Sequence, residues 1–244
     1  MKTIIITGGA SGLGENMVSY FSKNGEYKVV VFDINKSVQK DFKNTSVELY
    51  CVDVTKEEQV VQGVDEVFKK FGKIDVLVNN AGAIYNEALI NLMDSEDIKH
   101  KYENFSNYLS INLDSVFLVG SNVAAKMVEN RTKGVIINMS SIAANGNVGQ
   151  SAYSAAKAGV NALTKTWSKE LGRFGIRVVS ISPGFIDTKS TNEALSENTI
   201  KHIKSNTPLR RMGKPNNISS TVKFIIDNDF ITGTVVEIDG GLEI

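Results

Sequence analysis

The sequence begins with a short apolar run that leads into a glycine-rich turn, IIITGGASGLG over residues 4–14. Three consecutive isoleucines are typical of a strand that is buried on both faces of a sheet. Glycines in the turn let the backbone bend sharply and approach a pyrophosphate, and the N-terminus of the following helix stabilises that negative charge. The stretch therefore predicts a strand, a nucleotide-binding turn and a helix, with an ordinary tight turn as the alternative.

Apolar strands and helical patterns then alternate to the end of the chain. Six further strands are expected at residues 29–32, 47–52, 74–78, 135–139, 176–181 and 234–238. Continuous apolar strands separated by helices indicate a parallel sheet that is covered on both faces, and right-handed crossovers make such a sheet doubly wound. The sequence thus predicts one domain over residues 1–244, an α/β fold of the Rossmann type with a mainly seven-stranded parallel sheet in three α/β/α layers.

The composition argues against several classes of protein. The 244 residues include 27 Lys and Arg and 27 Asp and Glu without charge blocks, so nothing points to nucleic acid. No run approaches the roughly 18 apolar residues of a membrane span, and the first apolar run is too short for a secretion signal. Cys51 is the only cysteine, and His100 and His202 are far apart, so neither a disulfide nor a metal site is expected. We expect a cytoplasmic protein that binds neither nucleic acid nor membranes.

Glycines and short polar side chains follow almost every expected strand. They stand at residues 8–14, at Asp33, at Asp53, at residues 79–82, at Ser140 and Ser141, and at residues 182–184. The carboxyl ends of parallel strands share one edge of the sheet, and ligands of doubly wound sheets bind at that edge. We therefore expect these segments to line a single site.

Asp33 bears on the choice of nucleotide. It follows the glycine turn by about twenty residues and ends the second strand, where a carboxylate suits the ribose hydroxyls of adenosine. The same carboxylate repels a 2′-phosphate, which favours NAD over NADP. A role for Asp33 as a helix cap is the alternative, and the nearby Lys36 weakens the inference.

Tyr153 and Lys157 form the most unusual pair in the sequence. In a helix, residues four apart project from the same face. One unit charge at about 4 Å is worth roughly 4 kcal/mol at an effective dielectric near 20, or about 3 pKa units. We therefore expect Lys157 to lower the pKa of Tyr153 toward the range of general acid–base catalysis. The alternative is an amphipathic helix with an exposed lysine and a half-buried tyrosine.

Together these segments resemble the short-chain dehydrogenase/reductase family over nearly the whole chain. The family's motifs T-G-x-x-x-G-x-G, N-N-A-G, Y-x-x-x-K and P-G stand here, in that order, at residues 7–14, 79–82, 153–157 and 183–184. The resemblance implies an NAD(P)-dependent oxidoreductase that interconverts a secondary alcohol and a ketone by hydride transfer to or from nicotinamide. It also implies a homodimer or homotetramer built through helices near residues 106–130 and 151–172.

The resemblance implies roles for individual residues. Tyr153 is the acid/base, Lys157 lowers its pKa and holds the nicotinamide ribose, and Asn112 supports a water-linked proton path. The substrate-orienting serine is Ser140 if the spacing of thirteen residues to Tyr153 is kept, or Ser141 if the strand end is aligned. We choose Ser141, because loops accept deletions more readily than strands. The expected cofactor contacts are Gly8, Ser11, Gly12, Leu13, Gly14, Asp33, Asp53, Val54, Asn80, Ala81, Gly82, Tyr153, Lys157, Pro183, Gly184, Ile186 and Thr188.

Two loops bear on the substrate. Residues 84–101 form a longer loop than the resemblance implies, and residues 188–207 are polar enough for a lid with a helical segment. The polar lid favours a sugar, a polyol or a hydroxy acid, or a 3-hydroxyacyl or 3-oxoacyl thioester on a carrier. A nucleotide-sensing relative without catalysis and a scaffold are the alternatives, and the intact Tyr153–Lys157 pair argues against both.

Overall fold

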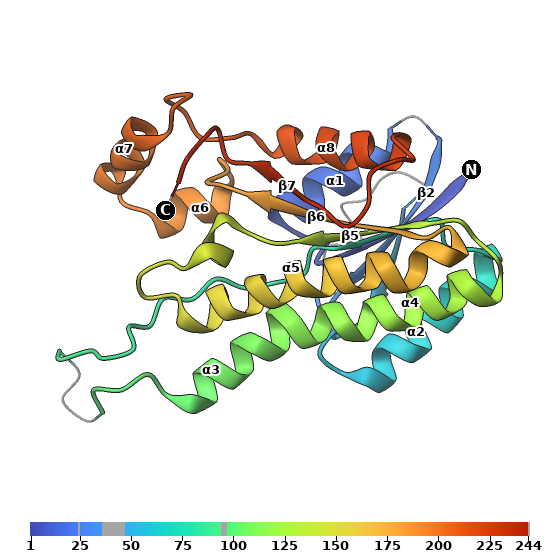
Figure 1. Cartoon of the computed structure of the whole chain (residues 1–244), viewed down its shortest axis with the longest axis horizontal. Coiled ribbons are helices and arrows are strands. Elements are labelled where there is room, and N and C mark those ends of the chain that lie inside the picture. The colour runs from blue at the N-terminus through green and yellow to red at the C-terminus, as the bar shows by residue number, and fades with distance from the viewer. Residues whose placement is uncertain (24, 36–46, 94–96, 244) are drawn as a thin grey trace.

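The structure is a computed structural model that describes residues 1–23, 25–35, 47–93 and 97–243. Seven parallel strands form one sheet in the order β3-β2-β1-β4-β5-β6-β7 (Figure 1). The strands are β1 (Lys2–Thr7), β2 (Tyr27–Asp33), β3 (Val47–Cys51), β4 (Val76–Asn79), β5 (Val135–Met139), β6 (Arg177–Pro183) and β7 (Val235–Ile238). The strand order reverses between β1 and β4, which places a ligand-binding crevice at their carboxyl ends. The predicted doubly wound fold is confirmed.

Helices cover both faces of the sheet (Figure 1). On one face lie α1 (Gly12–Ser22) and α8 (Pro215–Asp227), and on the other α2 (Glu57–Phe71), α4 (Ser115–Glu129) and α5 (Ser151–Leu171). Alternate residues of each strand supply the two cores: Ile4 and Ile6 pack with α1 and α8, whereas Ile5 packs with α2, α4 and α5. Both faces therefore need apolar residues, which explains the unbroken apolar strands of the sequence.

The fourth crossover departs from the expected single helix. Its first part, α3 (Tyr102–Leu109), joins α4 through a π-helical turn, η2 (Ser110–Asp114). A π turn inserts one residue into the helix, and such turns are frequent at functional sites. Here the turn contains Asn112, whose side chain is fully buried.

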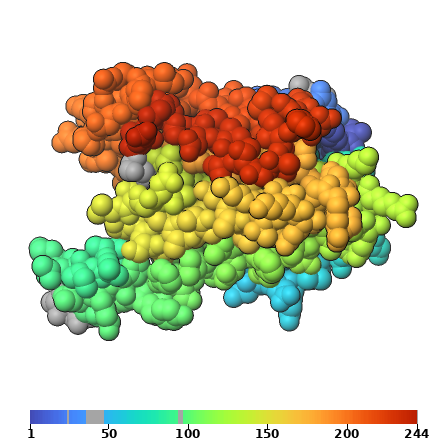
Figure 2. Space-filling view, in the orientation of Figure 1, coloured from blue at the N-terminus to red at the C-terminus, as the bar shows by residue number. Residues whose placement is uncertain are grey.

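The described parts of the loop at residues 84–101, which are 84–93 and 97–101, form an arm that projects beside α3 (Figure 2). Ile90 and Lys99 pair in an antiparallel bridge, while Glu87 pairs in parallel with Gln150. Glu87 also anchors the base of the arm, because its carboxylate accepts hydrogen bonds of 2.8 Å from Lys101 N and from Asn104 Nδ2. The exposed apolar side chains of the arm are Ile84, Tyr85, Leu89, Ile90, Leu92, Met93 and Ile98.

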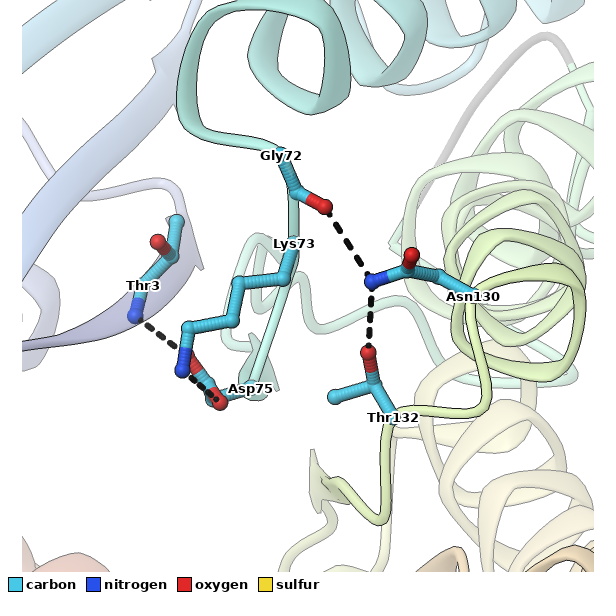
Figure 3. A network of polar contacts seen from close by, with 6 residues as sticks. All are labelled: Thr3, Gly72, Lys73, Asp75, Asn130 and Thr132. Carbon is cyan, nitrogen blue, oxygen red and sulfur yellow. Dashed lines mark hydrogen bonds and ion pairs between the residues drawn. The ribbon is translucent and has the colours of Figure 1, made fainter.

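Two groups of polar contacts lie at the amino-terminal edge of the sheet, one joining β1 to the residue before β4 and the other joining the end of α4 to Gly72, just after α2 (Figure 3). Asp75, just before β4, accepts a hydrogen bond of 2.7 Å from Thr3 N in β1 and pairs with Lys73 Nζ at 2.9 Å. Asn130 Nδ2, at the end of α4, donates to Thr132 Oγ1 at 3.2 Å. These bonds fix the edge opposite the expected ligand site.

No helix within the described ranges is both long enough and apolar enough to cross a membrane.

Candidate active site

A cavity of about 660 Å³ opens at the carboxyl edge of the sheet, where the glycine turn meets the start of α5. Almost all predicted site residues line it: Gly8, Ser11, Gly12, Leu13, Asp33, Asp53, Val54, Asn80, Ala81, Gly82, Asn112, Ser141, Tyr153, Lys157, Pro183, Gly184, Ile186 and Thr188. Residues far apart in the sequence thus meet around one space, as the shared edge of parallel strands requires.

Several lining residues were missed from the sequence. They are Phe32, Ile34, Val52, Thr55, Ala83, Ile84, Ile111, Met139 and Ser190. All of them lie within two positions of a residue that was chosen, so counting outward from each chosen residue would have found them. Ser190 lies in the lid, where composition alone does not indicate which side chains face the cavity.

Gly14 does not line the cavity, although the glycine pattern placed it among the cofactor contacts. It is buried in the first turn of α1, and a Cβ atom there would overlap the carbonyl oxygen of Gly8 and lie 2.8 Å from Asn80 Nδ2. A glycine is needed because the helix packs directly against the turn. Gly14 therefore contributes to the shape of the turn by allowing α1 to pack against Gly8, outside the cavity lining.

The first turn of α1 offers backbone N–H groups to the cavity. Its N-cap residue, Ser11, makes no side-chain capping bond. Gly8 and Gly12 have φ angles of 63° and 54°, in the left-handed region that favours glycine. A Cβ atom at Gly12 would meet no described protein atom within 4 Å, although Gly12 lines the cavity. This open cradle at a helix N-terminus fits the pyrophosphate of a dinucleotide.

Thr7 fixes the cradle to the end of β4. Its Oγ1 accepts hydrogen bonds from Asn80 N at 3.0 Å and from Ala81 N at 2.9 Å. Asn80 Nδ2 returns a bond of 3.0 Å to Thr7 O and one of 3.2 Å to Gly8 O. The N-N-A-G segment therefore acts as a brace for the glycine turn.

Asp33 is held at the cavity wall by two backbone amides. Ala10 N donates to Oδ2 at 3.0 Å, and Asn35 N donates to Oδ1 at 2.9 Å. The first bond links the end of β2 to the glycine turn, so the carboxylate is fixed beside the cradle. Lys36 and the residues that a helix capped by Asp33 would occupy lie outside the described residues.

The first two turns of α5 present Tyr153 and Lys157 to the cavity. Both are buried, with 8% and 4% of their surfaces exposed. Lys157 Nζ donates to the backbone oxygen of Met139 at 2.8 Å and lies 5.5 Å from the centroid of the Tyr153 ring. This burial argues against the alternative of an exposed lysine on an amphipathic surface.

The electrostatics of the pair differ from the expectation. Burial raises the pKa of Tyr153 above its ordinary value of 10.0, and the Ser141 hydroxyl opposes that rise. Burial also lowers the pKa of Lys157 to about 8. The expected lowering of the Tyr153 pKa by Lys157 is therefore wrong for this structure. The physical reason is that both groups lose their hydration, while the ammonium lies over the ring and bonds to Met139.

The two neighbouring serines have different surroundings. Ser141 Oγ accepts a hydrogen bond of 3.1 Å from Ala143 N, as the cap of the short helix η3 (Ile142–Asn145). A hydrogen bond with the Ser141 hydroxyl also opposes the rise in the pKa of Tyr153. Ser140 is buried, and its Oγ donates to the backbone oxygen of Lys157 at 3.2 Å. The hydroxyl of Ser140 is thus committed to α5, which favours Ser141 as the substrate-orienting serine.

Asn112 reaches the cavity from the π turn. Its Nδ2 donates to Ala83 O at 2.9 Å and to Tyr108 O at 3.0 Å, and its Oδ1 accepts from Ala83 N at 3.2 Å. A Cβ atom at Gly82 would lie 2.7 Å from Asn112 Oδ1 and 3.6 Å from Lys157 Nζ. Glycine at this position therefore leaves room for the Asn112 amide beside Lys157.

Residues 188–207 form two helices, α6 (Lys189–Ala194) and α7 (Glu197–Asn206), where one helical segment was expected. Thr188 and Ser190 line the cavity at the start of α6. The inner side of this lid is apolar: Leu195, Ile200 and Ile203 pack in a cluster with Ile142, Phe185, Met212 and Leu242. The lid is therefore polar on its outer side and is held against the rest of the protein by apolar contacts on its inner side.

Comparison with known proteins identifies relatives that match nearly the whole chain. A family model described as enoyl-(acyl carrier protein) reductase matches residues 8–243. The 3-oxoacyl-[acyl-carrier-protein] reductase of Thermotoga maritima is 39% identical over 252 aligned residues, which cover 100% of this chain and 98% of the relative. The chain belongs to the short-chain dehydrogenase/reductase family.

Two further short-chain dehydrogenase/reductase relatives widen the comparison. The sorbitol-6-phosphate 2-dehydrogenase of Klebsiella pneumoniae is 33% identical, covering 98% of this chain and 95% of the relative. A solved structure described as 4-hydroxyisoleucine dehydrogenase complexed with NADH matches with a TM-score of 0.85 at 29% identity, over 99% of this chain and 98% of that chain. The predicted family and reaction class are confirmed: the chain is an oxidoreductase that interconverts a secondary alcohol and a ketone with a nicotinamide nucleotide.

Proposed function

We propose that the chain reduces a 3-oxoacyl thioester to the 3-hydroxyacyl thioester, with Tyr153 as the acid/base. The observation that carries this proposal is the meeting of Tyr153 and Lys157 with the dinucleotide cradle in one cavity. The substrate class is supported by the Thermotoga maritima relative, whose name specifies a 3-oxoacyl group on acyl carrier protein.

The proposed residues divide the work between proton transfer and positioning. The bound nicotinamide nucleotide supplies the hydride. Tyr153 Oη donates its proton to the ketone oxygen, and the Ser141 hydroxyl donates a hydrogen bond to the same oxygen as negative charge develops there. Burial raises the pKa of Tyr153, which keeps the phenol in the protonated form that a proton donor needs. Lys157 holds the nicotinamide ribose, and Asn112 supports the path that returns a proton to Tyr153.

A phosphorylated sugar or polyol is the second candidate substrate. It is supported by the sorbitol-6-phosphate relative and by the exposed polar side chains of α6 and α7. The two candidates share the same reacting group, so only the part of the substrate beyond that group distinguishes them.

A substrate panel tests the proposal directly. The purified protein is incubated with NADH or NADPH and acetoacetyl-CoA, a 3-oxoacyl thioester, and in parallel with NAD or NADP and sorbitol 6-phosphate. We expect the thioester to have the higher kcat/KM, measured from the nicotinamide absorbance. Nucleotide binding without turnover of either compound would favour a nucleotide-sensing protein, and absence of nucleotide binding would favour a scaffold.

We propose NAD as the preferred nucleotide, because the Asp33 carboxylate is fixed beside the cradle. Asp33→Ala removes a negative charge that would repel a 2′-phosphate at short range. The ratio of kcat/KM for NADH to that for NADPH should therefore fall by about tenfold. Asp65→Ala, on the outer surface of α2, serves as a control that leaves the ratio unchanged. An unaltered ratio in Asp33→Ala would contradict the proposal that Asp33 selects NAD over NADP.

We also propose that the protein forms a homodimer or homotetramer through the outer faces of α4 and α5. On α5 the small residues Ala155, Ala158 and Ala162 are exposed, and on α4 the Phe117 side chain is 51% exposed. Small side chains let a helix of another copy approach closely, and an exposed aromatic ring favours burial. Sedimentation should give two or four times the monomer mass. A monomer at micromolar concentration would contradict the proposal.

A further inference from the structure

Three polar side chains lie in a row across the middle of the sheet, on the face that α5 covers. Asn79 of β4, Asn138 of β5 and Ser180 of β6 are paired in register and are almost fully buried. Asn79 Nδ2 donates to Asn138 Oδ1 at 2.9 Å. Polar groups buried this deeply destabilise a protein unless they are hydrogen-bonded, so the remaining partners of the row matter.

Two residues of α5 supply partners for Asn138 and Ser180. Asn138 Nδ2 donates to Thr164 Oγ1 at 2.9 Å. The Ser180 hydroxyl has two acceptors within reach, Asn138 O at 3.1 Å and Asn161 Oδ1 at 3.2 Å. Thr164 is completely buried. Two strands are therefore tied to one helix by directional bonds inside an otherwise apolar layer that includes Val160. We call these four bonded residues, Asn138, Ser180, Asn161 and Thr164, the α5 clamp.

The clamp lies on the same face of α5 as the catalytic lysine. Lys157, Asn161 and Thr164 are spaced i, i+4 and i+7, so their side chains point toward the sheet in one stripe. At the top of the stripe, Lys157 Nζ donates to Met139 O, the residue that follows Asn138. The strand that bonds Thr164 therefore also receives the ammonium group of Lys157.

Hydrogen bonds can fix the position of a helix along a sheet more strictly than apolar packing does. The hydrophobic contribution to packing is non-directional, whereas a hydrogen bond weakens steeply with distance and angle. A displacement of about 1 Å at a reacting group can lower a rate by about 100-fold. Thr164 lies about 16 Å along the helix from Tyr153, at about 1.5 Å per residue, so it acts on the site only through the position of α5.

We propose that the α5 clamp sets the height of Tyr153 and Lys157 above the carboxyl edge of the sheet, which makes Asn138 and Thr164 positioning residues for the reaction. The proposal rests on the proposed function, in which Tyr153 is the acid/base. A merely structural role would affect stability without changing the rate of the chemical step.

A pair of substitutions at Thr164 separates these roles. Thr164→Val keeps the shape and removes the hydroxyl that accepts from Asn138, whereas Thr164→Ser keeps the hydroxyl and removes the methyl group. With acetoacetyl-CoA and NADH, we expect Thr164→Val to lower kcat by about tenfold with KM within about twofold. Thr164→Ser should retain kcat within about twofold. Val123→Ala, in the same core on α4, should lower the melting temperature and leave kcat unchanged.

Equal kcat values in the Val and Ser variants, whether high or low, would overturn the proposal that the α5 clamp positions Tyr153 and Lys157. If the wild-type protein turns over no substrate, the proposed function fails, and the clamp is then tested through Lys157 by competitive acetylation at a series of pH values with mass spectrometry. In Thr164→Val the pH at which Lys157 becomes half-reactive should rise, because a displaced lysine is hydrated again. The Ser variant should match the wild type, and identical midpoints in both variants would overturn the proposal.

Discussion

Tyr153→Phe is expected to lower kcat by about 10³-fold while the dissociation constant of NADH stays within about twofold. The substitution removes the only atom of the side chain that transfers a proton and leaves the ring over which the Lys157 ammonium lies. Stopped-flow or steady-state rates with acetoacetyl-CoA, together with a fluorescence titration of NADH, measure the two quantities. Tyr27→Phe is the matched control, because Tyr27 is also buried but lies at the amino-terminal start of β2, away from the cavity.

The pH dependence of the wild-type protein provides a second measurement of the same prediction. Burial raises the pKa of Tyr153, so the phenol stays protonated through neutral pH. Reduction, which uses the phenol as an acid, should therefore be nearly independent of pH around neutrality, whereas oxidation, which uses the phenolate, should accelerate as the pH rises. Rates close to those of the wild type in Tyr153→Phe would remove this residue from the mechanism.

Gly14→Ala is expected to weaken NADH binding by at least about tenfold and to lower the free energy of unfolding by about 1–3 kcal/mol. The added Cβ atom would overlap the carbonyl oxygen of Gly8. Because that oxygen belongs to the backbone, the glycine turn itself must move, and the cradle for the pyrophosphate moves with it. NADH fluorescence and urea unfolding measure the two effects.

Gly134→Ala provides the matched control for Gly14→Ala. A Cβ atom at Gly134 would lie 2.7 Å from Met127 Cε and 2.9 Å from Asp75 O, at the amino-terminal edge of the sheet. It should cause a comparable loss of stability and leave the dissociation constant of NADH unchanged. Normal NADH binding by Gly14→Ala would show that the turn does not depend on the close packing of α1.

The strands could be located from the sequence because a sheet covered on both faces needs unbroken apolar runs. The run at residues 135–139 is β5, and the run at residues 47–52 is β3 to within one residue. The π turn of η2 could not be located in this way. It depends on one additional residue within a helix and on the bonds of Asn112 to the backbone of Ala83, and neither produces a pattern in the sequence.

The same reasoning predicted where the site lies, but it did not predict the direction in which the pKa of Tyr153 is shifted. Topology brings the carboxyl ends of the strands together, which is why residues as distant as Asp33 and Thr188 line one cavity. The pKa of Tyr153 depends on burial and on where the Lys157 ammonium binds. That ammonium bonds to the carbonyl of Met139, and because every residue carries a backbone carbonyl, the sequence does not single this one out.

The position of the Asp75 network has a consequence for protein engineering. The network fastens the amino-terminal edge of the sheet (Figure 3), whereas the cavity opens at the carboxyl edge. The five residues of β5 span about 17 Å between those edges. Substitutions at sites this far apart usually contribute independently. Selection for heat resistance and selection for a new substrate can therefore proceed in parallel on one chain, with gains at one edge preserved while the other is redesigned.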